Sequence, residues 1–115
     1  MPNGCDTVTE SLDVQWKKGV LDLCVLATLA RHDSYAYEIA SQLAEEIGMG
    51  EGTIYPLMRR MQTAGLVKTY LVETANGPPR KYYKLTAAGR ATFAAQKAEW
   101  EVFADAVAKI VGGRK

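Results

Sequence analysis

The hydrophobic pattern of this chain changes its period at Leu66, and this change limits the folds that the chain can adopt. Before Leu66, apolar residues recur every three or four positions, which is typical of amphipathic helices. After it, residues 67–74 and 80–85 alternate polar with apolar side chains and are rich in β-branched and aromatic residues. The segment 75–79, Ala-Asn-Gly-Pro-Pro, is a turn signal, so the two runs predict a β-hairpin. Because a lone two-stranded hairpin is unstable in water, it must pack on helices.

Three helices are predicted ahead of the hairpin. The first runs from about Trp16 and is apolar on nearly every side, which indicates packing on more than one face. Ser34 is placed to cap the second helix. The third begins at Glu51 or Thr53 and ends at Gly65, a residue typical of helix C-termini. Its predicted inner stripe consists of Ile54, Leu57, Met58 and Met61.

A long final helix is predicted over residues 87–111, capped by Thr86 and followed by two glycines. Apolar and polar residues along it step by three and four positions, the spacing of a coiled-coil seam. This row consists of Phe93, Gln96, Trp100, Phe103, Val107 and Ile110. Together with Trp16 and Val20 of the first helix, its apolar members are the predicted homodimer interface. Packing of this helix on its own domain is the alternative explanation of the same pattern.

The order of helix, helix, helix, hairpin and helix predicts a mainly α fold with a β-hairpin wing. At 115 residues the chain has room for one compact domain and one further element. We expect a flexible N-terminal arm over 1–13, a winged helix-turn-helix DNA-binding domain over 14–85, and a C-terminal dimerisation helix over 86–115.

The charge of the chain is unevenly distributed. Its net charge is only +1, but the segment from Arg59 to Arg90 holds seven basic residues against Glu73 alone. That segment therefore carries +6 and the rest of the chain −5. Positive charge gathered on one helix and one hairpin suits a polyanionic partner. A solvated basic face is the alternative.

The third helix and the hairpin are the elements that a winged helix presents to DNA. Gly52 and Thr53 leave the helix start unbulky, so that its backbone N–H groups can approach a phosphate. Arg59 and Arg60 can reach phosphates or a guanine edge. Tyr55 offers a hydroxyl and a flat face, or else packs against neighbouring tyrosines. The predicted contacts with double-stranded DNA are Tyr35, Thr53, Tyr55, Pro56, Arg59, Arg60, Lys68, Arg80 and Lys81.

Other classes of site find little support. The glycine-rich segment 48–53 follows a helix and lacks the lysine of a phosphate-binding loop. His32 is the only histidine and has no partners at metal-ligand spacing, so we expect no metal, no nucleophile–base pair, no cofactor and no enzyme activity. We also expect no disulfide between Cys5 and Cys24. The absence of a membrane span and of a secretory signal predicts a cytoplasmic protein.

Four separate segments, in order, resemble the PadR family of transcriptional regulators. The resemblance runs from about Trp16 to Ile110, and the single C-terminal helix resembles the compact, multidrug-responsive subfamily. The similar segments are Gly19–Leu26, Tyr35-Ala36-Tyr37-Glu38-Ile39, Gly52–Met61 with Gly65-Leu66-Val67, and Gly77–Gly89. Ala36 departs from the pattern, because the family often has glycine between the two tyrosines.

The resemblance implies a dimeric repressor, with its third helix in the major groove and its wing at the groove edge. It also implies release from DNA by small planar aromatic or cationic compounds, or by other signals. Trp100 matches, by its distance from Leu85-Thr86, a tryptophan that lines the drug pocket between subunits, although plain interface core is an alternative role. A winged-helix module that binds a protein partner and no DNA is the second hypothesis, and the salt dependence of DNA association distinguishes the two.

Overall fold

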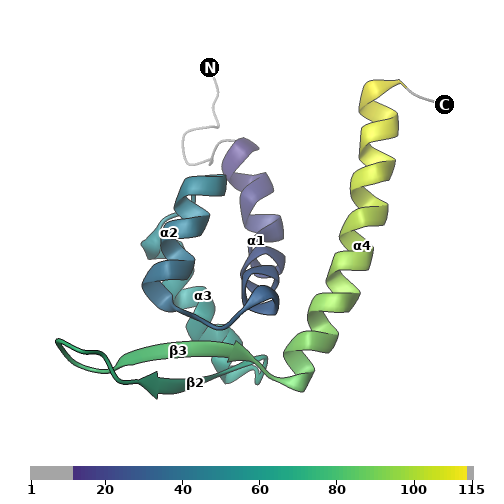
Figure 1. Cartoon of the computed structure of the whole chain (residues 1–115). Helices are drawn as coiled ribbons and strands as arrows, with labels where there is room; N and C mark the ends of the chain where they lie inside the picture. The colour runs from purple at the N-terminus through teal and green to yellow at the C-terminus, as the bar shows by residue number, and fades with distance from the viewer. Residues whose placement is uncertain (1–11, 114–115) are drawn as a thin grey trace.

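The computed structural model describes residues 12–113, with side chains from residue 19 onward. Three helices pack on a small antiparallel sheet, and a fourth helix leaves the end of the sheet and runs beside the first helix (Figure 1). The elements are α1 (Leu12–Arg31), β1 (Ser34–Tyr35), α2 (Ala36–Ile47), α3 (Glu51–Thr63), β2 (Val67–Val72), β3 (Arg80–Leu85) and α4 (Ala87–Gly112). This arrangement confirms the predicted winged-helix architecture with a long C-terminal helix. The predicted arm, residues 1–13, lies outside the described residues except for the first two residues of α1.

The core forms where the helical stripes meet one face of the sheet. Its fully buried side chains come from all three helices of the bundle: Val25, Leu26, Leu29, Ile39, Ile54, Leu57 and Met58. The strands add Val67, Tyr83 and Leu85, which lie at odd-numbered positions and therefore share a face. The predicted inner stripe of α3 is confirmed, because its four members are all buried.

The sheet has a third strand that the sequence did not predict. Ser34 and Tyr35 form β1, which pairs with Tyr83 and Tyr82 of β3, so that β3 is central. The prediction that Ser34 caps α2 is wrong: Tyr35 is the N-cap, and no side chain caps the helix. The Ser34 hydroxyl is buried and instead donates a 3.4 Å hydrogen bond to the His32 carbonyl oxygen. The short link between α1 and α2 is extended because it pairs with the otherwise open edge of β3.

The end of α3 is bonded to the start of α4. Gly65 has a positive φ of 80°, and the Leu66 and Gly65 N–H groups donate to the carbonyls of Met61 and Gln62, which makes a Schellman ending. Thr86 caps α4 by accepting a 3.0 Å hydrogen bond from the Gly89 N–H, as predicted. Its hydroxyl also donates to the Gly65 carbonyl at 2.6 Å. The helix that follows the sheet is thus tied directly to the turn that ends α3.

Two further findings concern the expectations about cysteine and membranes. Cys24 is a free, half-buried thiol in α1, and burial raises its pKa; Cys5 lies outside the described residues. Within residues 12–113, none of the helices has the length and apolar character needed to cross a bilayer.

Candidate DNA-binding face

The exposed side of α3 carries its two arginines. Arg59 and Arg60 are exposed, as is Pro56, while Thr53 and Tyr55 are half-buried on the flanks of the helix. Residues four and seven apart share a face of a helix. Arg59 therefore continues the row of Tyr55, and Arg60 continues the row of Pro56 and Thr53. The structure therefore brings the five residues of α3 that were predicted to contact DNA to one solvent-facing side of the helix.

Tyr55 lies between the core and the solvent-facing side of α3. Its ring packs against the core, and its side chain is only partly buried. Burial, followed by the nearby charge of Glu51, raises the pKa of the phenol. The hydroxyl is therefore protonated at neutral pH and can donate a hydrogen bond to a phosphate or a base edge.

The start of α3 has no side-chain cap. Its N-cap is Gly50, whose carbonyl accepts from the N–H groups of Thr53 and Ile54. The first-turn N–H groups of Glu51 and Gly52 are free of intrahelical partners, which is the arrangement that suits an anion. The exposed carboxylate of Glu51 opposes this, because it places a negative charge in the same turn.

The wing divides its cations between two faces. Paired residues across β2 and β3 lie on the same face, and neighbours along a strand lie on opposite faces. One face, which we term the outer face of the wing, carries Lys68, Tyr70, Val72, Arg80, Tyr82 and Lys84. Lys81 pairs with Leu71 on the opposite face, which continues into the core. Arg80 and Lys81 are both exposed near the tip, but they point in opposite directions.

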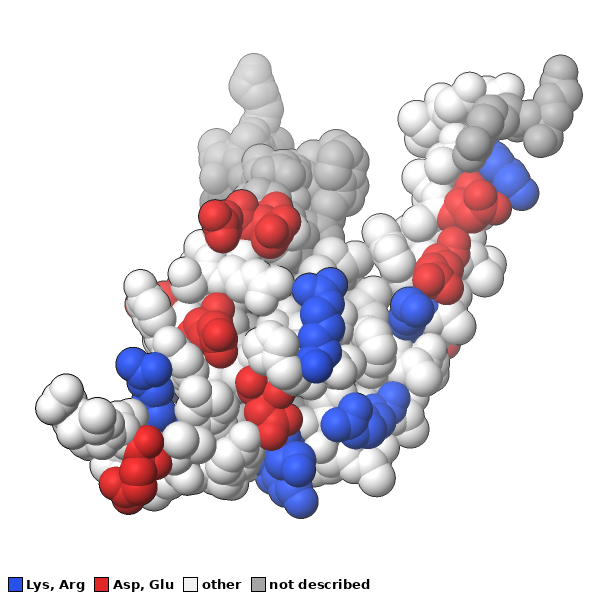
Figure 2. Space-filling view, viewed as in Figure 1, with Lys and Arg blue, Asp and Glu red and all other residues white. Residues whose placement is uncertain are grey.

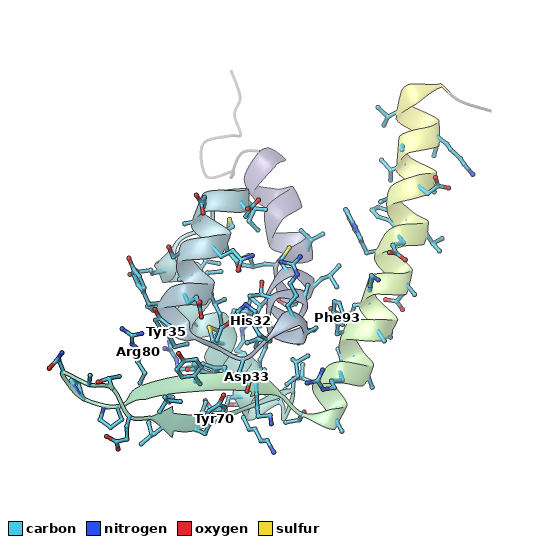
Figure 3. The ribbon with its side chains drawn as sticks, in the orientation of Figure 1. His32, Asp33, Tyr35, Tyr70, Arg80 and Phe93 are labelled. Carbon is cyan, nitrogen blue, oxygen red and sulfur yellow. The ribbon has the colours of Figure 1, made fainter. Side chains whose placement is uncertain are left out.

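Arg80 contacts Tyr35, so two residues predicted as separate DNA contacts form one unit. The guanidinium carbon lies 4.3 Å from the centroid of the Tyr35 ring (Figure 3). A guanidinium stacked on a ring keeps its N–H donors at the edges, where they can still meet a phosphate. On the other face of the wing, the Lys81 ammonium lies 5.7 Å from the centroid of the Tyr83 ring.

The positive charge of the segment 59–90 does not form one continuous patch on the side shown in Figure 2. Blue and red groups alternate over the sheet and the helices in this view. The helix α3 passes behind α2 and β3 in the same orientation (Figure 1). The cations that the sequence groups together are therefore shared among α3, the two faces of the wing and the start of α4.

The apolar row of α4 becomes more exposed toward the C-terminal end of the helix. Phe93 is half-buried and packs against the core of its own chain. Further along, Trp100 is 42% exposed, Phe103 62%, Val107 39% and Ile110 80%. The predicted interface member Trp16 lies in α1, but its side chain is outside the described part of the structure. Among the residues that the structure describes, the row is therefore covered most at its base and is more exposed further along.

A cleft of about 430 Å³ lies between α1 and α4. It brings together Val20, Trp100 and Phe103, three of the predicted interface residues. Among the described residues, its lining consists of Gly19, Val20, Asp22, Leu23, Gln96, Glu99, Trp100 and Phe103. Asp22 and Glu99 were not singled out from the sequence, since only the packing of α4 beside α1 brings these carboxylates to the tryptophan.

Other side chains near the wing were also missed. Asp33 accepts a 2.6 Å hydrogen bond from the Tyr70 hydroxyl, and Tyr82 stacks beside Tyr70 at 5.8 Å between ring centroids. No local signal links Asp33 to Tyr70, because they are 37 residues apart and meet only through the pairing of β1 with β3. The separation of Arg80 from Lys81, by contrast, follows from strand alternation and was readable from the sequence.

A three-helix bundle with a short strand between its first two helices, followed by a hairpin, defines a winged-helix DNA-binding protein, with α3 in the place of the recognition helix. The sequence matches the PadR-like family of transcriptional regulators over residues 25–95. The chain therefore belongs to this family, whose members are transcriptional regulators and not enzymes.

Solved structures of family members agree with this assignment. A PadR-like transcriptional regulator from Bacillus cereus is 33% identical and has a TM-score of 0.78, with 84% of this chain and 96% of that chain covered. A PadR family regulator from Eggerthella lenta is 32% identical, with a TM-score of 0.74 and coverage of 92% and 94%. One from Clostridium difficile is 32% identical, with a TM-score of 0.73 and coverage of 81% and 99%.

Proposed function

We propose that this regulator is a repressor that binds operator DNA as a homodimer and is released by a small planar aromatic or cationic compound or another signal. The observation that carries the proposal is the exposed apolar row of α4. Trp100, Phe103, Val107 and Ile110 follow a seam spacing and remain between 39% and 80% exposed among the described residues. A contiguous exposed apolar surface of this kind is typical of a protein–protein interface. A second copy offers the matching seam.

The cleft between α1 and α4 supports the same arrangement. Because Trp100 and Phe103 line the cleft together with Val20, the seam faces the opening between the two helices. A partner helix placed along this seam would contact α1 as well as α4. The resulting two-fold axis would set the distance between the two α3 helices, which must match one turn of duplex, about 34 Å.

The chemistry of the cleft suits the proposed class of ligand. Its volume of about 430 Å³ lies within the range of small-molecule sites. Trp100 supplies a flat aromatic face, and Asp22 and Glu99 supply negative charge. A planar cation would therefore gain both stacking and charge attraction in this place.

The DNA contacts in this proposal follow the geometry of the exposed side chains. We assign α3 to the major groove, where Arg59 or Arg60 reaches a base edge and Thr53, Tyr55 and Pro56 line the approach. Lys68, Lys81 and the Arg80–Tyr35 unit are assigned to phosphates beside it. The domain assignments of residues 14–85 to DNA binding and 86–115 to dimerisation are part of the same proposal.

Association with duplex DNA at increasing salt tests the DNA-binding part. A regulator that neutralises phosphates must show a steep negative slope of log affinity against log salt. An affinity that does not respond to salt, or no association at all, would favour the second hypothesis of a protein-interaction module.

Two neighbouring positions on α4 test the dimer. Phe103 lies on the seam, whereas Val102 is 72% exposed and lies about 200° around the helix from Trp100. We expect the wild type to be a dimer at micromolar concentration by sedimentation. Phe103→Glu, or Trp100 and Phe103 changed together to polar residues, should dissociate it, while Val102→Glu should leave it a dimer. A monomeric wild type, or equal dissociation by both single variants, would contradict the assigned seam.

A further inference from the structure

The outer face of the wing carries a row of three tyrosines, one from each strand of the sheet. Tyr35 of β1 lies opposite Tyr82 of β3, which in turn lies opposite Tyr70 of β2. The ring centroids of Tyr35 and Tyr82 are 5.4 Å apart with the rings tilted, and those of Tyr70 and Tyr82 are 5.8 Å apart with the rings stacked. The row therefore crosses the full width of the sheet.

Each edge of this row is bound to a residue from another part of the chain. The Tyr70 hydroxyl donates a 2.6 Å hydrogen bond to Oδ2 of Asp33, which precedes β1 at the far edge of the sheet (Figure 3). The Arg80 guanidinium covers the ring of Tyr35, which is the N-cap of α2. Both strands of the wing are thereby linked to the segment between α1 and α2.

These links lie where the wing leaves the support of the core. Beyond Tyr70 on β2, Leu71 and Val72 are exposed, and the connecting residues 73–79 are nearly all exposed. On β3, Tyr83 is buried whereas Arg80 and Lys81 are exposed. The angle of the outer half of the wing therefore depends on the last contacts with the body, and the Asp33–Tyr70 hydrogen bond is one of them.

We propose that Asp33 and Tyr70 are positioning residues for DNA binding, which hold the wing at the angle where its cations meet the phosphate backbone. The proposal rests on the proposed DNA binding of the wing. Asp33 itself carries the wrong charge for a DNA contact, so its effect must pass through Tyr70. The hydrogen bond to Asp33, more than burial, raises the pKa of the Tyr70 phenol, so the hydroxyl keeps its proton at neutral pH and can donate it in this bond.

The sign of the effect separates positioning from simple electrostatics. If Asp33 acts only as a charge near DNA, then its removal reduces repulsion and strengthens binding. If it positions the wing, then its removal weakens binding although the protein has become more positive. Glu73 is the matched control, because it is an exposed carboxylate on the hairpin that carries Tyr70, and Glu73→Gln changes the charge by the same amount as Asp33→Ala.

The experiment measures binding of the wild type and four variants to a random-sequence duplex by fluorescence anisotropy, between about 50 and 200 mM salt. We expect Tyr70→Phe and Asp33→Ala each to weaken binding about three- to tenfold, the range of one lost hydrogen bond. Both should flatten the log–log salt slope by about one. The double variant should be no weaker than either single variant, because one interaction is removed in all three. Glu73→Gln should bind as tightly as the wild type or more tightly.

The variants must stay folded for this comparison, which circular dichroism and urea unfolding establish. Amide hydrogen exchange supplies a readout that does not require DNA: exchange should accelerate at residues 71–81 in Tyr70→Phe but not in α3. Tighter DNA binding by Asp33→Ala, or unchanged binding by Tyr70→Phe, would overturn the positioning role. If the DNA affinity of the wild type does not depend on salt, then the proposal of DNA binding fails and the positioning role is judged by hydrogen exchange alone. Unchanged amide exchange at residues 71–81 in Tyr70→Phe would overturn the positioning role.

Discussion

Arg59 and Arg60 are consecutive, exposed cations of α3, yet the helix gives them different surroundings. Arg59 extends the row that contains the half-buried Tyr55, whereas Arg60 extends the row of Pro56 and Thr53. When α3 enters a groove, one row faces the bases more directly and the other lies nearer a backbone. The two side chains are therefore expected to contribute unequally to sequence recognition.

Alanine substitutions should separate base reading from backbone contact. Replacing the arginine that meets a guanine edge should weaken the free energy of binding to operator DNA by about 1–3 kcal/mol. It should also relax the sequence preference at one base pair. Lys68→Ala and Lys81→Ala should instead weaken operator and random DNA alike and reduce the salt slope by about one. Binding titrations on both duplexes at several salt concentrations check this. Equal losses on the two duplexes for both arginines would show that neither reads a base.

The junction of α3 and α4 places Gly89 against backbone. A methyl group at this position would overlap the carbonyl oxygen of Leu66 and press on the side chain of Leu85. Gly89 is also the residue whose N–H binds the Thr86 cap. Since Thr86 bonds to the turn that ends α3, this close approach sets how α4 leaves the winged-helix domain.

We expect Gly89→Ala to destabilise the protein by at least the ~1–3 kcal/mol typical of overpacking, because the atom in the way is backbone and cannot move aside. Urea unfolding measures this as a lower midpoint with an unchanged slope. Gly112→Ala is the matched control at the other end of α4, where an added methyl group meets no atom within 4 Å. It should be neutral or slightly stabilising, because alanine favours helix more than glycine does. Similar losses in both variants would contradict the role of close approach.

Sequence patterns predicted the elements whose signals are local. The stripe of α3, its glycine ending and the Thr86 cap all depend on residues within one or two helical turns, and all are confirmed. The strand β1 was missed because two residues are too short for an alternating pattern, and Ser34 is also a common N-cap residue. Its extended backbone follows from pairing with β3, almost 50 residues later.

The candidate site was predictable to a similar degree. The residues of α3 that we propose to contact DNA share a helical periodicity, so their common face followed from spacing. The Tyr35–Arg80 contact and the Asp33–Tyr70 hydrogen bond depend on the register of a three-stranded sheet. Because β1 was not predicted from the sequence, the register that brings these side chains together could not be derived. The cleft that adds Asp22 and Glu99 to Trp100 required the packing angle of α4 against α1.

The molecule as a whole separates its two proposed tasks along its length. The sheet and the wing lie at one end, and α4 extends to the other beyond the cover of α1 (Figure 1). Since α4 is a single helix whose start is bonded to the end of α3, a change in how two copies of α4 pack would move the recognition helices as rigid units. Ligand control in this arrangement needs only a change of half-site spacing.

This coupling predicts that ligand and DNA weaken each other's binding. The chain has two tryptophans, so a Trp16→Phe background leaves Trp100 as the only indole reporter. A planar cationic dye should quench its fluorescence as the dye enters the cleft and stacks on the ring. By linkage, saturating operator DNA should lower the dye affinity by the same factor by which the dye lowers DNA affinity.

The carboxylates of the cleft provide the control for this experiment. Changing Asp22 to Asn and Glu99 to Gln should weaken the binding of a cationic dye by about 0.2–1 kcal/mol for each exposed charge that is removed. The binding of a neutral planar dye should not change. Equal loss for both dyes would mean that the variants disturb the shape of the cleft and not its charge. Quenching that is indifferent to DNA would show that the cleft binds the dye without moving the recognition helices. That result would leave the proposed dimer seam of α4 intact and would place the proposed release signal elsewhere.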